Sequence, residues 1–145
     1  MLYLSKIFDR TNGRVALYAT DDTDGRGWFE GITPTVEGIG FRRVGRERDL
    51  GIFPIGTTDF SPLINEWKDF DAQLLMGNAP SPDTGTLLRQ CCEMGFRPEA
   101  ICATKGVTFY EAIDAWAGNL SYGVITDGLW SPNCDPVLCP GDLPP

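Results

Sequence analysis

Hydrophobic and polar positions along the first sixty residues form short runs that alternate imperfectly and are separated by glycine, asparagine and proline. Such runs predict β-strands. The first covers residues 2–8 and the second residues 14–20, and Asn12-Gly13 between them is a strong hairpin signal because both residues tolerate positive φ. Three more short strands are predicted over residues 28–32, 38–44 and 50–55. We therefore expect an antiparallel β-meander or a small barrel in this half of the chain.

A helical spacing of apolar residues begins at Ser61. Ser61 is a good capping residue, and Pro62 suits the first helical position. Apolar side chains then recur at steps of three and four, which predicts a helix over residues 61–76 with one buried face. These side chains are Leu63, Ile64, Trp67, Phe70, Leu74 and Leu75.

Two more helices and a late strand are predicted further along the chain. Residues 84–94 form a helix that ends at Gly95, and a capping box at Thr108–Glu111 begins another over residues 108–118. Residues 120–126 predict a strand that rejoins the N-terminal sheet. The predicted fold class is α+β: a meander or small barrel packed with two or three helices.

The last sixteen residues contain five prolines, which excludes a helix or a central strand. Trp130, Val137 and Leu138 give this stretch apolar side chains to bury. The predicted organisation is a single α+β domain over residues 1–130 and an extended, proline-rich C-terminal arm over residues 131–145. The arm lies either on its own domain or across a neighbouring subunit.

Three aspartates between residues 19 and 31 resemble part of a calcium loop. When Gly25 is aligned with the glycine of such a loop, Thr20, Asp22 and Asp24 take the first three ligand positions. The twelfth position, where a glutamate is required, is then Gly31. The preceding segment also predicts a strand instead of a helix. The spacing therefore favours a turn between strands over a metal site.

Composition sets the outer limits of the fold. A chain of 145 residues with 42% hydrophobic and 22% charged residues is typical of one folded domain. The N-terminus lacks a basic head followed by an apolar stretch, so we expect no secretory signal and a location in the cytoplasm of the producing cell or in an assembled virion. Residues 1–60 hold nine acidic and eight basic side chains, and residues 61–145 hold eleven and four. This acidic balance excludes a general nucleic-acid binder.

Histidine is absent, which removes serine–histidine and cysteine–histidine catalysis and every histidine metal site. The carboxylate pairs Asp69 with Asp71 and Glu111 with Asp114 show no sign of facing a cleft. The cysteines lack the two close pairs of a zinc site, and their odd number fits a reducing compartment. They are Cys91, Cys92, Cys102, Cys134 and Cys139. We therefore expect no enzyme, no cofactor and no metal.

Arg42, Arg43, Arg46 and Arg48 form the main basic cluster. Acidic residues interrupt it, so it is either a solvated hairpin tip or a contact point for an acidic protein partner. With Trp130, Val137 and Leu138 of the arm, these arginines are the predicted partner-binding residues.

Three function classes remain. The sequence favours a non-enzymatic assembly protein, with a bacteriophage virion subunit (capsid decoration, neck or tail) as the specific hypothesis and other protein subunits as partners. The alternatives are a phage-encoded inhibitor that acts through an acidic face and a small carboxylate-dependent hydrolase. No nucleic-acid or membrane partner is expected.

Overall fold

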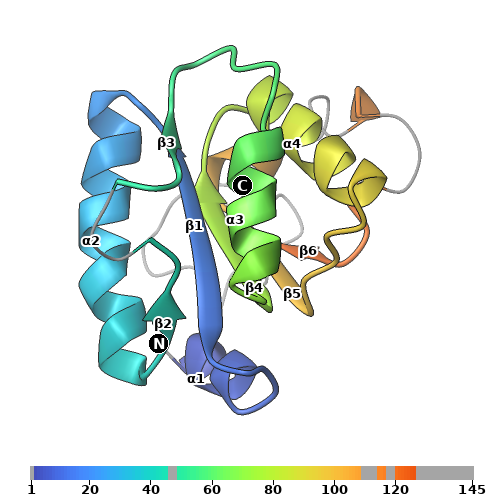
Figure 1. Cartoon of the computed structure of the whole chain (residues 1–145). Helices are drawn as coiled ribbons and strands as arrows, with labels where there is room; N and C mark the ends of the chain where they lie inside the picture. The colour runs from blue at the N-terminus through green and yellow to red at the C-terminus, as the bar shows by residue number, and fades with distance from the viewer. Residues whose placement is uncertain (1, 46–48, 109–113, 117–119, 127–145) are drawn as a thin grey trace, which may run out of the picture.

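The computed structural model describes residues 2–45, 49–108, 114–116 and 120–126, which form a β-sheet with helices on both faces (Figure 1). The strands are β1 (Arg14–Thr20), β2 (Arg42–Arg43), β3 (Ile52–Phe53), β4 (Leu74–Asn78), β5 (Ala100–Ala103) and β6 (Val124–Ile125). The helices are α1 (Leu2–Phe8), α2 (Thr23–Ile39), α3 (Ser61–Asp69), α4 (Ser81–Glu93) and the short 3-10 helix η1 (Lys105–Val107).

All strand pairs in this sheet are parallel. The strand order is β2-β1-β4-β5-β6, and β3 also pairs with β1. Arg42 of β2 lies beside Arg14 at the start of β1, whereas Ile52 of β3 lies beside Ala19 near its end. β2 and β3 therefore act as one interrupted edge strand, and the topology is that of a doubly wound α/β sheet. The predicted α+β fold with an antiparallel meander or barrel is wrong.

Two hydrophobic clusters hold the helices on the two faces. On one face, α3 and α4 pack against the sheet around Tyr18, Trp67 and Leu87, all of which are fully buried. On the other face, α1 and α2 pack around Leu17, Phe29 and Leu74. Since both faces of the central strands are covered, β1 and β4 are apolar almost throughout, as buried parallel strands are.

The first two helices occupy segments for which strands and a loop were predicted. Residues 2–8 form α1, so Asn12-Gly13 is a turn from a helix into β1 and not a hairpin. Gly13 nevertheless has a φ of 70°, the backbone conformation that the dipeptide signalled. The aspartate-rich segment leads into α2, with Asp22 as the N-cap and Asp24 in the first turn, and the predicted strand over residues 28–32 lies within this helix.

The sequence of α2 conceals a helix because it contains several glycines, threonines and an internal proline, Pro34. Its apolar side chains do recur at helical spacing, from Trp28 and Phe29 through Ile32 to Val36. These side chains pack into the cluster on the α2 face. Tertiary packing therefore outweighs weak local propensity.

The predicted helix over residues 61–76 is two elements. α3 begins at Ser61 as expected but ends at Asp69, and Asp71 turns the chain with a φ of 54°. The apolar residues that follow belong to β4, which is buried along its whole length. A continuous apolar run fits either a helix face or a buried strand, and its position after a turn decides for the strand.

The other predicted elements have mixed outcomes. α4 confirms the helix predicted over residues 84–94, although it begins at Ser81, and β6 confirms a strand within residues 120–126. β6 joins the sheet through β5, a strand that was not predicted. The predicted third helix over residues 108–118 lies largely outside the described residues.

Candidate functional site

The carboxyl ends of β1 and β4 border the point where the chain reverses its direction of winding. The helix that follows β1 packs on one face of the sheet, and the helix that follows β4 packs on the other. In doubly wound sheets such a divergence opens a crevice at the carboxyl edge, and ligands bind there.

Polar side chains from separate elements meet at this edge. Asp24, in the first turn of α2, accepts hydrogen bonds from Asn78 at the end of β4 (3.2 Å) and from Lys105 of η1 (3.0 Å). The Asn78 amide oxygen lies 3.0 Å from the hydroxyl of Thr104, which directly follows β5. Thr126, after β6, donates to the Thr104 carbonyl. We call Asp24, Asn78, Thr104 and Lys105 the edge network.

The members of the edge network differ in exposure. Asn78 is buried, whereas the side chains of Asp24 and Lys105 are 64% and 43% exposed. A partly exposed ion pair of this kind contributes little to stability. Its two charged groups can therefore exchange partners with a bound molecule at small cost to the fold.

A pocket of about 440 Å³ lies beside the edge network. Thr104 and Thr126 form its polar part. Trp28 and Ile32 of α2 form one apolar wall, and Met76, Cys102, Ala103 and Ile125 of the sheet complete the lining. An apolar pocket with a few polar groups at one end is the usual arrangement of a small-molecule site.

Asp22 is the N-cap of α2 at the carboxyl edge of the sheet. Its carboxylate accepts hydrogen bonds from the Gly25 backbone N–H (2.8 Å) and from the Thr20 hydroxyl (2.7 Å). Both hydrogen bonds lower the pKa of Asp22, and the bond from the Gly25 backbone has the larger effect. A β-carbon on Gly25 would overlap the Thr20 carbonyl oxygen, so the start of α2 requires glycine there.

Because the folded pKa of Asp22 lies below the unfolded value near 3.8, its contribution to stability is full above that value and is lost as the pH falls through the folded pKa. Asp22→Asn keeps a capping oxygen but does not titrate. We expect the midpoint of urea unfolding to fall less for Asp22→Asn than for the unsubstituted protein as the pH is lowered from about 5 to about 2. Equal losses would contradict this role for Asp22.

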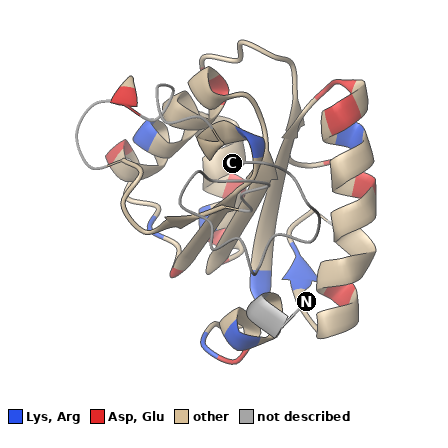
Figure 2. Ribbon diagram, turned by 180° about the vertical axis from the view of Figure 1, so that it is seen from behind, with Lys and Arg blue, Asp and Glu red and all other residues tan. Residues whose placement is uncertain are grey.

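The predicted arginine cluster lies elsewhere. Arg42 and Arg43 form β2 beside the start of β1, at the amino edge of the sheet (Figure 2). They are neighbours on a strand and point to opposite faces: the Arg42 guanidinium lies 6.0 Å from the Phe70 ring and that of Arg43 lies 5.3 Å from the Phe29 ring. Both residues nevertheless line one pocket of about 320 Å³ at this edge, together with Glu37, Phe41 and Phe70.

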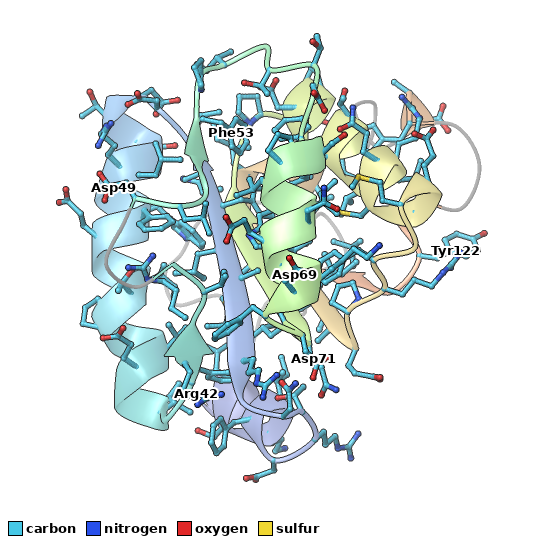
Figure 3. All side chains as sticks on the ribbon, viewed as in Figure 1. Arg42, Asp49, Phe53, Asp69, Asp71 and Tyr122 are labelled. Carbon is cyan, nitrogen blue, oxygen red and sulfur yellow. The ribbon has the colours of Figure 1, made fainter. Side chains whose placement is uncertain are left out.

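Arg14 also takes a structural role at the amino edge. Its guanidinium donates to the carbonyl of Phe70, the C-cap of α3, and pairs with Asp71 at 3.3 Å. Figure 3 shows Arg42 and Asp71 near this end of the sheet and Phe53 further towards the carboxyl edge. Arg46, Arg48, Trp130, Val137 and Leu138 lie outside the described residues, and no finding tests the predicted partner contacts.

The other chemical candidates stay apart. Asp69 and Asp71 are exposed near the end of α3, and Asp114 is exposed, while Glu111, Cys134 and Cys139 lie outside the described residues. Cys91 and Cys92 are free thiols. Within the described ranges no three histidine, cysteine, aspartate or glutamate side chains gather as a metal site, and no helix has the length and apolarity to span a bilayer.

The edge network was missed because its members look unremarkable in the sequence. Each follows an apolar run: Asp24 comes after Val15–Thr20, Asn78 ends Leu74–Asn78, and Thr104-Lys105 follow Ala100–Ala103. Once these runs are recognised as parallel strands, the polar residues after them belong to the same edge of the sheet. The antiparallel prediction concealed that signal.

Comparisons with known proteins bear on the fold. No family model matches the chain, and no curated protein matches it in sequence. Solved structures do match. A leucine-binding protein from Thermotoga maritima has a TM-score of 0.71 and 20% sequence identity, and the match covers 94% of this chain and 39% of that protein. A branched-chain amino acid ABC transporter protein from Rhodospirillum rubrum, described as putative, has a TM-score of 0.68 and 18% identity, and the match covers 85% of this chain and 34% of that protein. A periplasmic binding protein type 1 from Bordetella pertussis Tohama I has a TM-score of 0.67 and 12% identity, and the match covers 85% of this chain and 32% of that protein.

These likenesses show the fold. The chain has the parallel α/β architecture of a periplasmic binding protein of type 1 and spans about a third of the length of the proteins it resembles. The virion-subunit hypothesis is wrong, because the similar structures compared are described as ligand-binding and transporter proteins and not as phage structural proteins. The inhibitor and hydrolase alternatives, which rested on the acidic face and on carboxylate pairs, gain no support from these likenesses.

Proposed function

We propose that this chain is a non-catalytic binding domain for a small molecule with a charged head and an apolar body. One observation carries the proposal: the edge network lies at the reversal point of a doubly wound sheet and opens onto the apolar pocket beside α2. A pocket of about 440 Å³ is within the usual size range of small-molecule sites.

The chemistry of the edge network and of the adjacent pocket lining suggests a class of ligand. Asp24 offers a carboxylate to a ligand ammonium group, and Lys105 offers an ammonium group to a ligand carboxylate. The apolar walls formed by Trp28, Ile32 and Ile125 suit a hydrocarbon side chain. Free amino acids with apolar side chains combine these features, and a leucine-binding protein is among the structures with the same fold.

The fold also suggests how binding is organised. Periplasmic binding proteins close two domains around a ligand by a hinge. The chain covers about a third of such proteins, so it supplies one wall of a site of that kind, with the carboxyl edge of its sheet facing the ligand.

Isothermal titration calorimetry with a panel of L-amino acids tests the proposal. We expect one or more apolar members to bind, and Asp24→Asn or Lys105→Met to raise the dissociation constant about tenfold or more, equivalent to about 1.4 kcal/mol. The ligand should be recovered unchanged by mass spectrometry, since no reaction is proposed.

Asp69→Asn is the matched control, because Asp69 is an exposed carboxylate on α3 outside the edge network and the pocket. Its dissociation constant should equal that of the unsubstituted protein. The proposal fails if no panel member binds, or if the Asp24 and Lys105 variants bind as tightly as the Asp69 variant.

A further inference from the structure

A second pocket lies at the amino edge of the sheet. Its volume is about 320 Å³, and it is lined by Glu37, Phe41, Arg42, Arg43 and Phe70. We call it the amino-edge pocket. The edge network and the pocket beside α2 contain none of these residues, so the two ends of the sheet can be tested separately.

The C-terminal end of α2 brings residues of the amino-edge pocket together. Gly40 caps α2 with a φ of 116°, and the Phe41 N–H donates to the Val36 carbonyl at 3.0 Å. A glycine cap of this kind satisfies the last carbonyls of a helix and turns the chain sharply, here directly into β2. Figure 1 shows β2 beside the last turn of α2. Glu37 of the helix and Arg42 of the strand therefore line the same pocket.

Backbone hydrogen bonds fix the strand that carries the two arginines. The Arg42 N–H donates to the Gly13 carbonyl at 2.7 Å, and the Val44 N–H donates to the Val15 carbonyl at 3.0 Å. The chain then turns away from the sheet at Gly45, which has a φ of 62°. The arginine side chains are therefore carried by a backbone that is anchored on β1 and not by a hairpin tip.

The Phe70 ring holds the Arg42 guanidinium in place. The two groups are 6.0 Å apart, which is a cation–π distance. Phe70 itself packs against the core cluster on the α3 side, and the Arg14 guanidinium lies 5.7 Å from its ring. Arg14 is paired with Asp71, whereas Arg42 is exposed and has no carboxylate partner among the described residues. Stacking on a ring leaves the in-plane N–H donors of a guanidinium available to a ligand.

The lining of the amino-edge pocket indicates a class of ligand. Phe41, which is 3% exposed, and Phe70 supply aromatic surface. The formal charges of two arginines and one glutamate leave a net charge of +1, so one negative charge on a ligand balances the pocket and a second would be repelled by Glu37. A guanidinium binds a carboxylate through two parallel hydrogen bonds. The volume is at the lower end of the range for small-molecule sites.

We propose that the amino-edge pocket binds a small aromatic carboxylate, whose carboxylate group pairs with Arg42 and whose ring packs against Phe41 and Phe70. Arg43 adds positive charge on the same side of the sheet. Phosphate esters carry up to two negative charges at neutral pH, so they bind more weakly beside Glu37. This second ligand site lies at the opposite edge of the sheet from the edge network.

Titration of ¹⁵N-labelled protein with phenylacetate at neutral pH, followed by NMR, tests the proposal. We expect saturable shifts of the backbone amide signals of residues 41–43 and 70. Phenylacetamide has the same ring without the charge and should bind about tenfold more weakly. Phenyl phosphate should also bind more weakly than phenylacetate. Arg42→Gln should raise the dissociation constant of phenylacetate about tenfold or more.

Two variants serve as controls. Arg97→Gln removes an exposed arginine outside the amino-edge pocket and should bind phenylacetate as the unsubstituted protein does. Lys105→Met removes the ammonium group of the edge network, where a carboxylate could also bind, and should leave the shifts of residues 41–43 and 70 unchanged. Shifts that disappear in the Lys105 variant would place the ligand at the carboxyl edge and overturn the proposal.

Other results also overturn the proposal. These are the absence of saturable shifts at residues 41–43 and 70, tighter binding of phenyl phosphate than of phenylacetate, and an unchanged dissociation constant in a folded Arg42→Gln variant. If that variant does not fold, as judged by circular dichroism, the comparison of phenylacetate with phenylacetamide on the unsubstituted protein decides. Equal affinity for the acid and the amide then excludes a role for the guanidinium.

Discussion

Trp67→Ala is expected to lower the free energy of unfolding by about 3–5 kcal/mol, the usual cost of removing a large aromatic side chain from a core. Trp67 on α3 is fully buried. Its ring lies 6.4 Å from that of Tyr18 on β1 and 6.0 Å from that of Phe96 after α4. The side chain therefore joins α3 to the sheet and to the end of α4, and its loss leaves a cavity shared by three elements.

Urea unfolding followed by circular dichroism measures this loss. Trp67→Phe should cost much less, because it keeps an aromatic ring and removes a buried indole N–H that has no hydrogen-bond acceptor among the described residues. Asn65→Ala, an exposed position on the same helix, is the control and should change stability little. A loss below about 1 kcal/mol for Trp67→Ala would show that the core closes around the space.

Gly77→Ala is expected to cost about 1–3 kcal/mol or more through overpacking. Gly77 on β4 lies directly beside Tyr18 on β1, and a β-carbon at Gly77 would overlap the Tyr18 ring. Tyr18 is fully buried and lies against Phe53 and Trp67, so its ring cannot move aside freely.

A double-mutant cycle tests this explanation. Tyr18→Leu removes the ring, so the double variant Gly77→Ala/Tyr18→Leu should cost less than the sum of the two single variants. Gly31→Ala on α2 is the control: its β-carbon would meet open space, and we expect a gain of about 0.5–1 kcal/mol from the better helix former. Additive losses would exclude a clash between Gly77 and Tyr18.

The contrast between α3 and α2 shows what the sequence can predict. The start of α3 at Ser61-Pro62 and the body of α4 follow from capping and apolar spacing, which are local properties. α2 depends on the cap from Asp22 and on packing of Phe29 and Val36 against a sheet formed by distant segments. Its glycines and Pro34 oppose helix formation locally, so the spacing of its apolar residues was the remaining signal.

The candidate site was hidden for a related reason. Asp24, Asn78 and Lys105 are far apart in the sequence and meet only because β1, β4 and β5 are parallel neighbours. An antiparallel prediction places the ends of successive strands at opposite edges and separates these residues. The strand direction, which depends on the crossover helices, therefore had to be known before the site could be recognised.

Over the part of the chain that the structure describes, the strands at both margins of the sheet are short, which has a consequence for aggregation. β2, β3 and β6 contain two residues each, and the first two are separated by the turn around Gly45 and Gly51. A long, flat margin offers a row of unpaired backbone groups that recruits strands from other molecules and promotes fibril formation. Edge strands of two residues expose few unpaired backbone groups, so they offer little surface on which a strand of another molecule can pair. The concentrated protein should therefore resist intermolecular β-aggregation while its fold is intact.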